Sequence, residues 1–205
     1  MIVKKIKNII FDVGDVLLEY RWKDMLMDYG LSKEEAVKVG NLMFDNKLWS
    51  VLDLGTMSDE EVISEYARLY PEYATVMEWF IKNGEYMHVA RPKVWERVHK
   101  LKTMGYGIYI LSNYSRNLFE KHTKGASFLE DVDGMVVSYQ IHIAKPDKKI
   151  YEYLLNKYNL IAQECIFFDD RPDNTKAARQ MGIEAVTVTG QDFLISKLDE
   201  IIDNK

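Results

Sequence analysis

Five polar residues follow short apolar runs of this chain, and their types suit nucleophilic and metal chemistry. They are Asp12, Ser112, Asn113, Asp169 and Asp170. A carboxylate such as Asp12 at the end of a buried strand costs free energy unless it is paired or bound to a metal. An isolated aspartate in this position more often caps a turn. The interpretation of Asp12 therefore depends on the other four residues.

The adjacent carboxylates Asp169 and Asp170 favour a metal site. Two neighbouring carboxylates repel each other, and a hard divalent cation relieves that repulsion. Mg²⁺ prefers oxygen ligands and keeps several of its waters, so one carboxylate from each of two strands is a typical protein contribution. The alternative interpretation is a solvated acidic turn before a helix that begins at Pro172.

Ser112, Asn113 and Lys145 could supply hydrogen-bond donors to an anion. The hydroxyl and the amide can bind phosphate oxygens, although both residue types are also common at helix N-caps. Lys145 precedes a helix that we expect to begin near Pro146, where the helix dipole favours anions. A lysine there can hold a phosphate and offset carboxylate repulsion, although a single lysine is by default a surface residue.

The apolar runs predict how the chain positions these side chains. Five runs alternate with helical patterns and are expected to form buried strands near residues 6–12, 108–111, 135–137, 166–168 and 185–188. This alternation predicts an α/β fold with a doubly wound, Rossmann-like parallel sheet and helices on both faces. Ligands of such sheets bind beyond the carboxyl ends of the strands. The polar residues that end the runs should therefore meet at one edge of the sheet.

Residues 19–90 differ from the rest, because helical spacings dominate and convincing strands are missing. Capping boxes at Ser32 and Ser58 each predict the start of a helix. We expect several helices of about three turns each. The predicted domain organisation is an α/β core formed by residues 1–18 and 91–205, with a helical cap over residues 19–90 inserted after the first strand.

Composition excludes several classes of protein. Hydrophobic residues make up 47% of the 205 residues and charged residues 29%, which is typical of a folded globular protein and not of a disordered chain. The net charge of −5 and the lack of a basic block argue against a nucleic-acid partner. No apolar stretch approaches the roughly 20 residues of a membrane span. With a single cysteine, Cys165, and no export signal, we expect a cytoplasmic protein.

Taken together and in this order, the motifs resemble the haloacid-dehalogenase-like superfamily over nearly the whole chain. Asp12 in IIFDVGDVL matches the nucleophile of the first motif, and Ser112-Asn113 in IYILSNYS match the phosphate-binding second motif. Lys145 in AKPDKKIY matches the third motif, and Asp169-Asp170 in IFFDDRPDN match the acidic fourth motif. This branch is similar to sugar-phosphate phosphatases and to the phosphatase domain of epoxide hydrolases.

The resemblance implies an Mg²⁺-dependent phosphatase that forms an aspartyl phosphate on Asp12. It implies Ser112, Asn113 and Lys145 as groups that bind the phosphate, with Lys145 also stabilising charge during transfer. It implies that Asp12, the Gly14 carbonyl and Asp170 hold the metal, with Asp169 acting through water or from behind, although these last two could be exchanged. The implied partner is a small phosphorylated metabolite, and the resemblance suggests a sugar phosphate. A monomer and a homodimer are not distinguished.

Gly14 departs from the family pattern, which usually has an aspartate there that acts as general acid and base. Asp15 is the nearest residue that could replace it. The departure leaves open a phosphate-binding protein with weak or no turnover. A metal-independent 2-haloacid dehalogenase is a second alternative, against which the acidic pair argues. A phosphoacceptor signalling domain is a third, and the long helical insert is foreign to that design.

Overall fold

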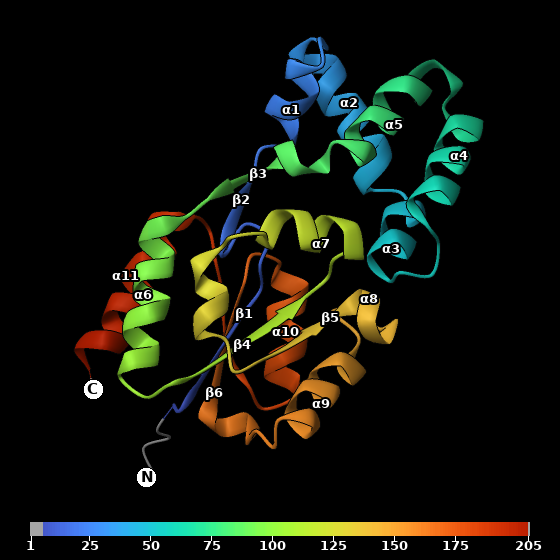
Figure 1. Cartoon of the computed structure of the whole chain (residues 1–205). Coiled ribbons are helices and arrows are strands. Elements are labelled where there is room, and N and C mark those ends of the chain that lie inside the picture. The colour runs from blue at the N-terminus through green and yellow to red at the C-terminus, as the bar shows by residue number, and fades with distance from the viewer. Residues whose placement is uncertain (1–5, 205) are drawn as a thin grey trace.

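The computed structural model describes residues 6–204, and a five-stranded parallel sheet forms its centre (Figure 1). The strand order is β5-β4-β1-β6-β7, so β1 lies in the middle and the chain adds strands first on one side of it and then on the other. The strands are β1 (Asn8–Phe11), β4 (Gly107–Ser112), β5 (Gly134–Val137), β6 (Cys165–Asp169) and β7 (Glu184–Thr187). The predicted α/β fold class is confirmed.

Helices cover both faces of this sheet because each central strand is apolar on both sides. Ile9 and Phe11 of β1 point into one buried cluster, and Ile10 between them points into the other. This is the two-residue alternation of a strand. The first cluster packs under α6 (Pro92–Thr103) and α11 (Gln191–Asp203), and the second under α9 (Lys148–Lys157) and α10 (Pro172–Gln180).

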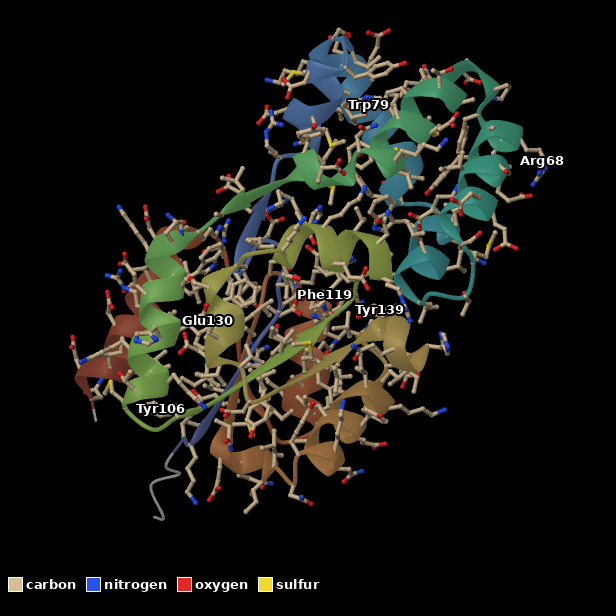
Figure 2. All side chains as sticks on the ribbon, viewed as in Figure 1. Arg68, Trp79, Tyr106, Phe119, Glu130 and Tyr139 are labelled. Atoms are coloured by element: carbon tan, nitrogen blue, oxygen red, sulfur yellow. The ribbon has the colours of Figure 1, made fainter. Side chains whose placement is uncertain are left out.

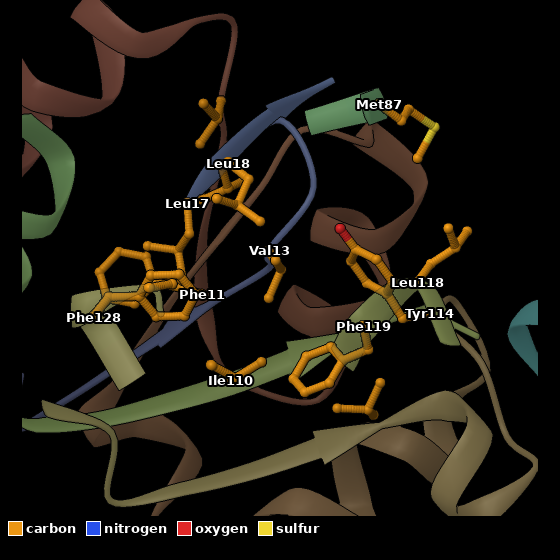
Figure 3. Packing of buried hydrophobic residues seen from close by; sticks show 14 of the residues in the cluster. Phe11, Val13, Leu17, Leu18, Met87, Ile110, Tyr114, Leu118, Phe119 and Phe128 are labelled. Carbon is orange, nitrogen blue, oxygen red and sulfur yellow. The ribbon is translucent and has the colours of Figure 1, made fainter. Parts of the chain in front are cut away.

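The first cluster continues past the strand into the loop that follows Asp12. Val13, Leu17 and Leu18 are buried there beside Phe11 and Phe128, as Figure 3 shows. Burying each such side chain stabilises the fold by about 1.5–3 kcal/mol. The loop therefore has a fixed shape, and it holds the residues after Asp12 in place.

A helical insert, formed by helices α1 to α5, extends from one end of the sheet (Figure 1). Its helices are α1 (Trp22–Asp28), α2 (Lys33–Phe44), α3 (Lys47–Asp53), α4 (Asp59–Leu69) and α5 (Ala74–Lys82). The predicted capping boxes are confirmed, since Ser32 and Ser58 cap α2 and α4. Two of the helices, α1 and α3, are only 7 residues long and so are shorter than the three turns expected.

The expectation that residues 19–90 contain no strand is wrong at both ends of that range. Strand β2 (Leu18–Tyr20) pairs antiparallel with β3 (His88–Ala90) and links the helical insert to the sheet. Each strand has three residues, too few to show a period of two in the sequence. Beside this ribbon, the buried Arg91 guanidinium donates to the carbonyl oxygens of Asp15 at 2.6 Å and Val16 at 3.3 Å.

The remaining helical elements of residues 6–204 are short. They are α7 (Arg116–Thr123), α8 (Ser138–Ile141) and four short 3₁₀ segments at Pro71–Tyr73, Gly84–Met87, Ser127–Asp131 and Ala162–Glu164. Phe119 on α7 and Tyr139 on α8 lie below the helical insert (Figure 2). Within residues 6–204, no helix combines the length and the apolar character that crossing a bilayer requires.

Candidate active site

Asp12 lies just beyond the end of β1 and is surrounded by donors. Its backbone N–H donates to the Phe168 carbonyl, which continues the pairing of β1 with β6 by one residue. Its Oδ1 accepts from the Ser112 hydroxyl at 2.5 Å and lies 2.9 Å from the Lys145 ammonium. Only 8% of Asp12 is exposed. The structure therefore brings together the ends of β1 and β4, as the strand order predicts.

Lys145 forms a buried bridge between two of the predicted acidic residues. Its Nζ contacts Asp12 Oδ1, donates to Asp169 Oδ2 at 2.7 Å and donates to the Leu111 carbonyl at 2.8 Å. Burial alone would lower the pKa of Lys145, but the charges of Asp12 and Asp169 outweigh burial and raise it. The lysine therefore stays charged and fixes the distance between the two carboxylates.

Asp169 and Asp170 have different surroundings although they are adjacent. Both oxygens of the fully buried Asp169 accept hydrogen bonds, which come from Lys145, the Arg171 backbone and the Asn174 amide. In contrast, no hydrogen bond among the described residues ends on the Asp170 carboxylate, which lines the cavity beside Asp12. Asp170 is therefore the freer of the two to bind a cation, in agreement with the order of roles that the sequence favours.

The three carboxylates form a cluster that fits a divalent cation. Asp12, Asp169 and Asp170 each place an oxygen within 4.8 Å of the others. Burial, followed by the charge of Asp169, raises the pKa of Asp12 to about 6, against the opposing influence of Lys145 and Ser112. Burial, followed by the charges of Asp12 and Asp169, raises the pKa of Asp170 to about 7. A cation with oxygen ligands would relieve this repulsion.

We expect these raised pKa values to make the metal-free protein less stable as the pH rises. A carboxyl whose pKa is raised by folding contributes stability below its unfolded value, and that contribution is lost as the pH rises through the folded value. For Asp170 the window runs from about 4 to about 7. Asp170→Asn, which removes the charge, should therefore approach the melting temperature of wild type near pH 4 and exceed it near pH 8, both measured in chelator.

Added Mg²⁺ should reverse this order at pH 8, because it stabilises the wild type more than Asp170→Asn. If Asp170→Asn is the less stable protein at pH 8 in chelator, the carboxylate is not repelled by its neighbours and the argument for a cation fails.

The side-chain amide of Asn113 is hydrogen-bonded to the backbone of Lys145. Its Nδ2 donates to the Lys145 carbonyl at 2.9 Å, and its Oδ1 accepts from the Lys145 backbone N–H at 2.8 Å. The amide thus holds the loop that carries Lys145 against the end of β4. Contact of the Asn113 and Ser112 side chains with a phosphate stays a prediction, since both are already engaged within the protein.

Gly14 is required by a residue that the sequence did not single out. A Cβ added at Gly14 would lie 2.4 Å from the ring and 2.5 Å from the hydroxyl oxygen of Tyr20, so this ring fills the space of any larger side chain. Asp15, next in the chain, has a positive φ of 52°, and its Oδ1 accepts from the Tyr20 backbone N–H at 2.9 Å. Its predicted acid–base role stays a prediction. No sequence signal connects Gly14 with Tyr20.

A cavity of about 370 Å³ opens above these groups, between the sheet edge and the helical insert. Asp12, Gly14, Asn113, Lys145 and Asp170 line it from the sheet side. The insert adds an aromatic wall (Trp22, Phe44 and Trp49), whose ring centroids are 5.2 and 4.6 Å apart in sequence order. These aromatics pack on one another and also line the cavity.

The insert also contributes Asp53, which sequence reasoning missed. Asp53 is the last residue of α3 and lines the cavity together with Asp12. Its backbone carbonyl accepts from the Ser138 hydroxyl at 2.5 Å, which attaches α3 to the core. A lone aspartate in a helix carries no motif, so only the fold shows that it faces the strand ends.

A family model for haloacid dehalogenase-like hydrolases matches residues 6–182. The sesquiterpene phosphatase astK of Aspergillus oryzae is 30% identical over 187 residues, which cover 89% of this chain and 90% of that protein. The D-ribitol-5-phosphate phosphatase of Bacteroides thetaiotaomicron is 24% identical over 197 residues, 87% of this chain and 90% of that protein.

Other relatives are larger. The chain is 25% identical to the drimenol cyclase drtB of Aspergillus calidoustus over 96% of its own length, but spans only 36% of the cyclase. It spans 19% of the mouse acyl-CoA dehydrogenase family member 10, at 24% identity.

Solved structures share the fold. A HAD family enzyme of Bacteroides thetaiotaomicron, solved with magnesium and inorganic phosphate, matches with a TM-score of 0.70 at 21% identity, over 90% of this chain and 95% of that one. A dehalogenase solved as an intermediate complex matches with a TM-score of 0.68 at 19% identity, over 93% and 88%. At these identities the likeness concerns the fold alone.

Proposed function

The chain belongs to the haloacid dehalogenase-like hydrolase family, and from this premise we propose that it is an Mg²⁺-dependent phosphatase of small phosphate monoesters. One observation carries the proposal. The Asp12 carboxylate is held by Ser112 and Lys145 beside a cluster of acidic oxygens that suits a divalent cation. A nucleophile that is itself anionic can approach a phosphate dianion only where positive charge is provided.

In the proposed reaction Asp12 attacks phosphorus and becomes an aspartyl phosphate, which water then hydrolyses. Lys145 keeps its charge during both steps and stabilises the transferring group. Ser112 orients the Asp12 carboxylate through its hydrogen bond to Oδ1. Asp12, Asp170 and the Gly14 carbonyl would hold Mg²⁺, with Asp169 behind them. The cation supplies charge stabilisation to the phosphoryl oxygens.

We propose that the organic part of the substrate carries no further negative charge. The carboxylates of Asp15 and Asp45 line the cavity outside the metal cluster, where Arg171 is also found. Like charges brought together on binding cost several kcal/mol. A sugar or sugar-alcohol phosphate meets this condition, as does the phosphate ester of an apolar alcohol. The predicted cap, residues 19–90 over a core of 1–18 and 91–205, would close over this substrate, and we place the enzyme in the cytoplasm.

Two other readings of the site predict different products. A metal-independent haloacid dehalogenase would need only an aspartate nucleophile, whereas here three carboxylates share one small volume. A phosphate-binding protein with little turnover would explain Gly14. It would still need the cation, so Mg²⁺-dependent ligand binding without phosphate release would support it.

We expect release of inorganic phosphate from uncharged sugar-alcohol phosphates with Mg²⁺, and loss of this activity in chelator. For these substrates kcat/KM should exceed that of a carboxylated phosphate ester of the same size at least about tenfold, because of the carboxylates in the cavity. Halide release from 2-haloacids, measured in parallel with and without chelator, provides the contrast. Halide release that survives chelation, with no phosphate release, would refute the proposal.

A further inference from the structure

Tyr20 occupies the position from which the family pattern would supply a general acid, but it cannot replace that acid. Its hydroxyl donates to Tyr114, the Tyr114 hydroxyl contacts His122 Nδ1 at 3.0 Å, and His122 Nε2 contacts the Gly84 carbonyl at 2.7 Å. The chain ends on an acceptor, so each group in it donates to the next group of the protein. Burial also raises the pKa of Tyr20 well above its ordinary value. The Tyr20 hydroxyl therefore keeps its proton and uses it in a hydrogen bond within the protein.

Asp15 is a poor replacement for a different reason. Its carboxylate is part of a turn, since Oδ1 accepts from the Tyr20 backbone N–H. Its charge acts on Asp170, but the cation that acts on it is Arg91, beside the β2–β3 ribbon. Its backbone has a positive φ, which fixes the direction of the side chain at a local cost.

Asp53 belongs to the helical insert and lines the same cavity as the proposed nucleophile. It lines the main cavity with Asp12 and also an adjoining cavity of about 250 Å³ with Asn113 and Lys145. The Ser115 backbone N–H donates to its carboxylate, and the Ser138 hydroxyl holds its carbonyl. Ser115 thus holds the carboxyl of Asp53 and Ser138 holds its backbone, in a cavity that Asp12 also lines. A fixed carboxyl in the cavity of the nucleophile suits an acid–base group.

We propose that the Asp53 carboxyl is the proton donor and acceptor of the reaction, and that it replaces the side chain missing at Gly14. This inference rests on the proposed phosphatase function. In the first step Asp12 bonds to phosphorus, the bond from phosphorus to the ester oxygen breaks, and Asp53 gives its proton to that oxygen. In the second step Asp53 takes a proton from water as the water oxygen bonds to phosphorus and the bond to Asp12 breaks. Phosphate leaves and Asp53 is again protonated.

The charges around Asp53 agree with this role. Burial, followed by the charge of Asp12, raises its pKa to about 7, while the Ser115 N–H, Lys145 and Arg171 act in the opposite direction. The neutral groups that face it are the hydroxyls of Tyr20, Tyr66 and Tyr114. A carboxyl with such a pKa exchanges protons near neutral pH, which favours general acid and base catalysis in turn.

The test compares two leaving groups in Asp53→Asn. With 4-nitrophenyl phosphate, whose leaving group needs no proton, the variant should release a burst of one nitrophenol per enzyme and then stall as an aspartyl phosphate, visible by intact mass. With a sugar-alcohol phosphate there should be no burst, and kcat should fall on the order of 10²- to 10³-fold. The burst also proves that the variant is folded. Asp53→Ala should recover activity on added formate, and exposed Asp24→Asn should behave as wild type.

Three results overturn the inference. The first is that Asp53→Asn turns over both substrates as wild type does. The second is that the burst with 4-nitrophenyl phosphate and the loss of kcat with the sugar-alcohol phosphate occur in Asp15→Asn and not in Asp53→Asn. The third is that formate leaves the activity of Asp53→Ala unchanged. If wild type releases nitrophenol and phosphate but activity does not depend on Asp53, the phosphatase proposal still stands. A wild type that releases phosphate from no ester removes both.

Discussion

Asp12→Asn should abolish phosphate release, with kcat falling by at least about 10⁴-fold on any ester, the scale seen when a nucleophile is removed. The amide has the shape of the carboxylate but cannot bond to phosphorus as an anion. The change also deletes one of the three carboxylates of the cluster. The measurement is steady-state phosphate release in Mg²⁺, together with intact mass of enzyme quenched during turnover, in which only wild type should contain a phosphoryl adduct.

This variant separates loss of chemistry from loss of folding. The Asp12 carboxylate is the proposed nucleophile, and its charge also repels the neighbouring carboxylates. Its pKa is raised to about 6, chiefly by burial, so removing the charge should not destabilise the chelated protein near neutral pH. Asp192→Asn, an exposed aspartate at the start of α11, is the matched control and should keep full activity. Residual turnover above about 1% of wild type in Asp12→Asn would assign the nucleophile elsewhere.

The strand ends show how much of this site the sequence predicts. Apolar runs ending in Asp12, Ser112 and Asp169 fix three strands, and parallel pairing must bring their carboxyl ends to one edge. The structure adds that Lys145 joins Asp12 to Asp169, a contact between residues more than 130 positions apart in one case. The fold class follows from the same pattern, whereas the order of the strands comes from the structure.

The sequence does not predict the site residues whose positions depend on how the helical insert packs against the core. Tyr20 fills the space at Gly14 only because the β2–β3 ribbon turns it toward β1, and strands of three residues have no periodic signal. Asp53 is one of several acidic residues on amphipathic helices, where exposed acids are the rule. Its place depends on how α3 meets Ser115 and Ser138, which is a tertiary contact.

Lys145→Met should be the most damaging change to stability among the site residues. Methionine has a similar length, so the loss is mainly one of charge, and it leaves Asp12 and Asp169 buried without their shared cation. Removing one partner of a buried ion pair costs about 3–5 kcal/mol. We expect a loss of this size in the free energy of unfolding near pH 8 in chelator, measured by urea denaturation, and loss of phosphatase activity.

The pH dependence identifies the cause of that loss. Without Lys145 the folded pKa of Asp12 rises further, so the protein can protonate this carboxyl at low pH and avoid the repulsion. The destabilisation should therefore be smaller near pH 5 than near pH 8, and Mg²⁺ should restore part of it at pH 8 by replacing the lost positive charge. Lys148→Met, an exposed lysine of α9, should change stability by less than about 0.5 kcal/mol. An equal loss at both pH values would mean that Lys145 contributes packing and not charge, and the electrostatic account of the site would then be wrong.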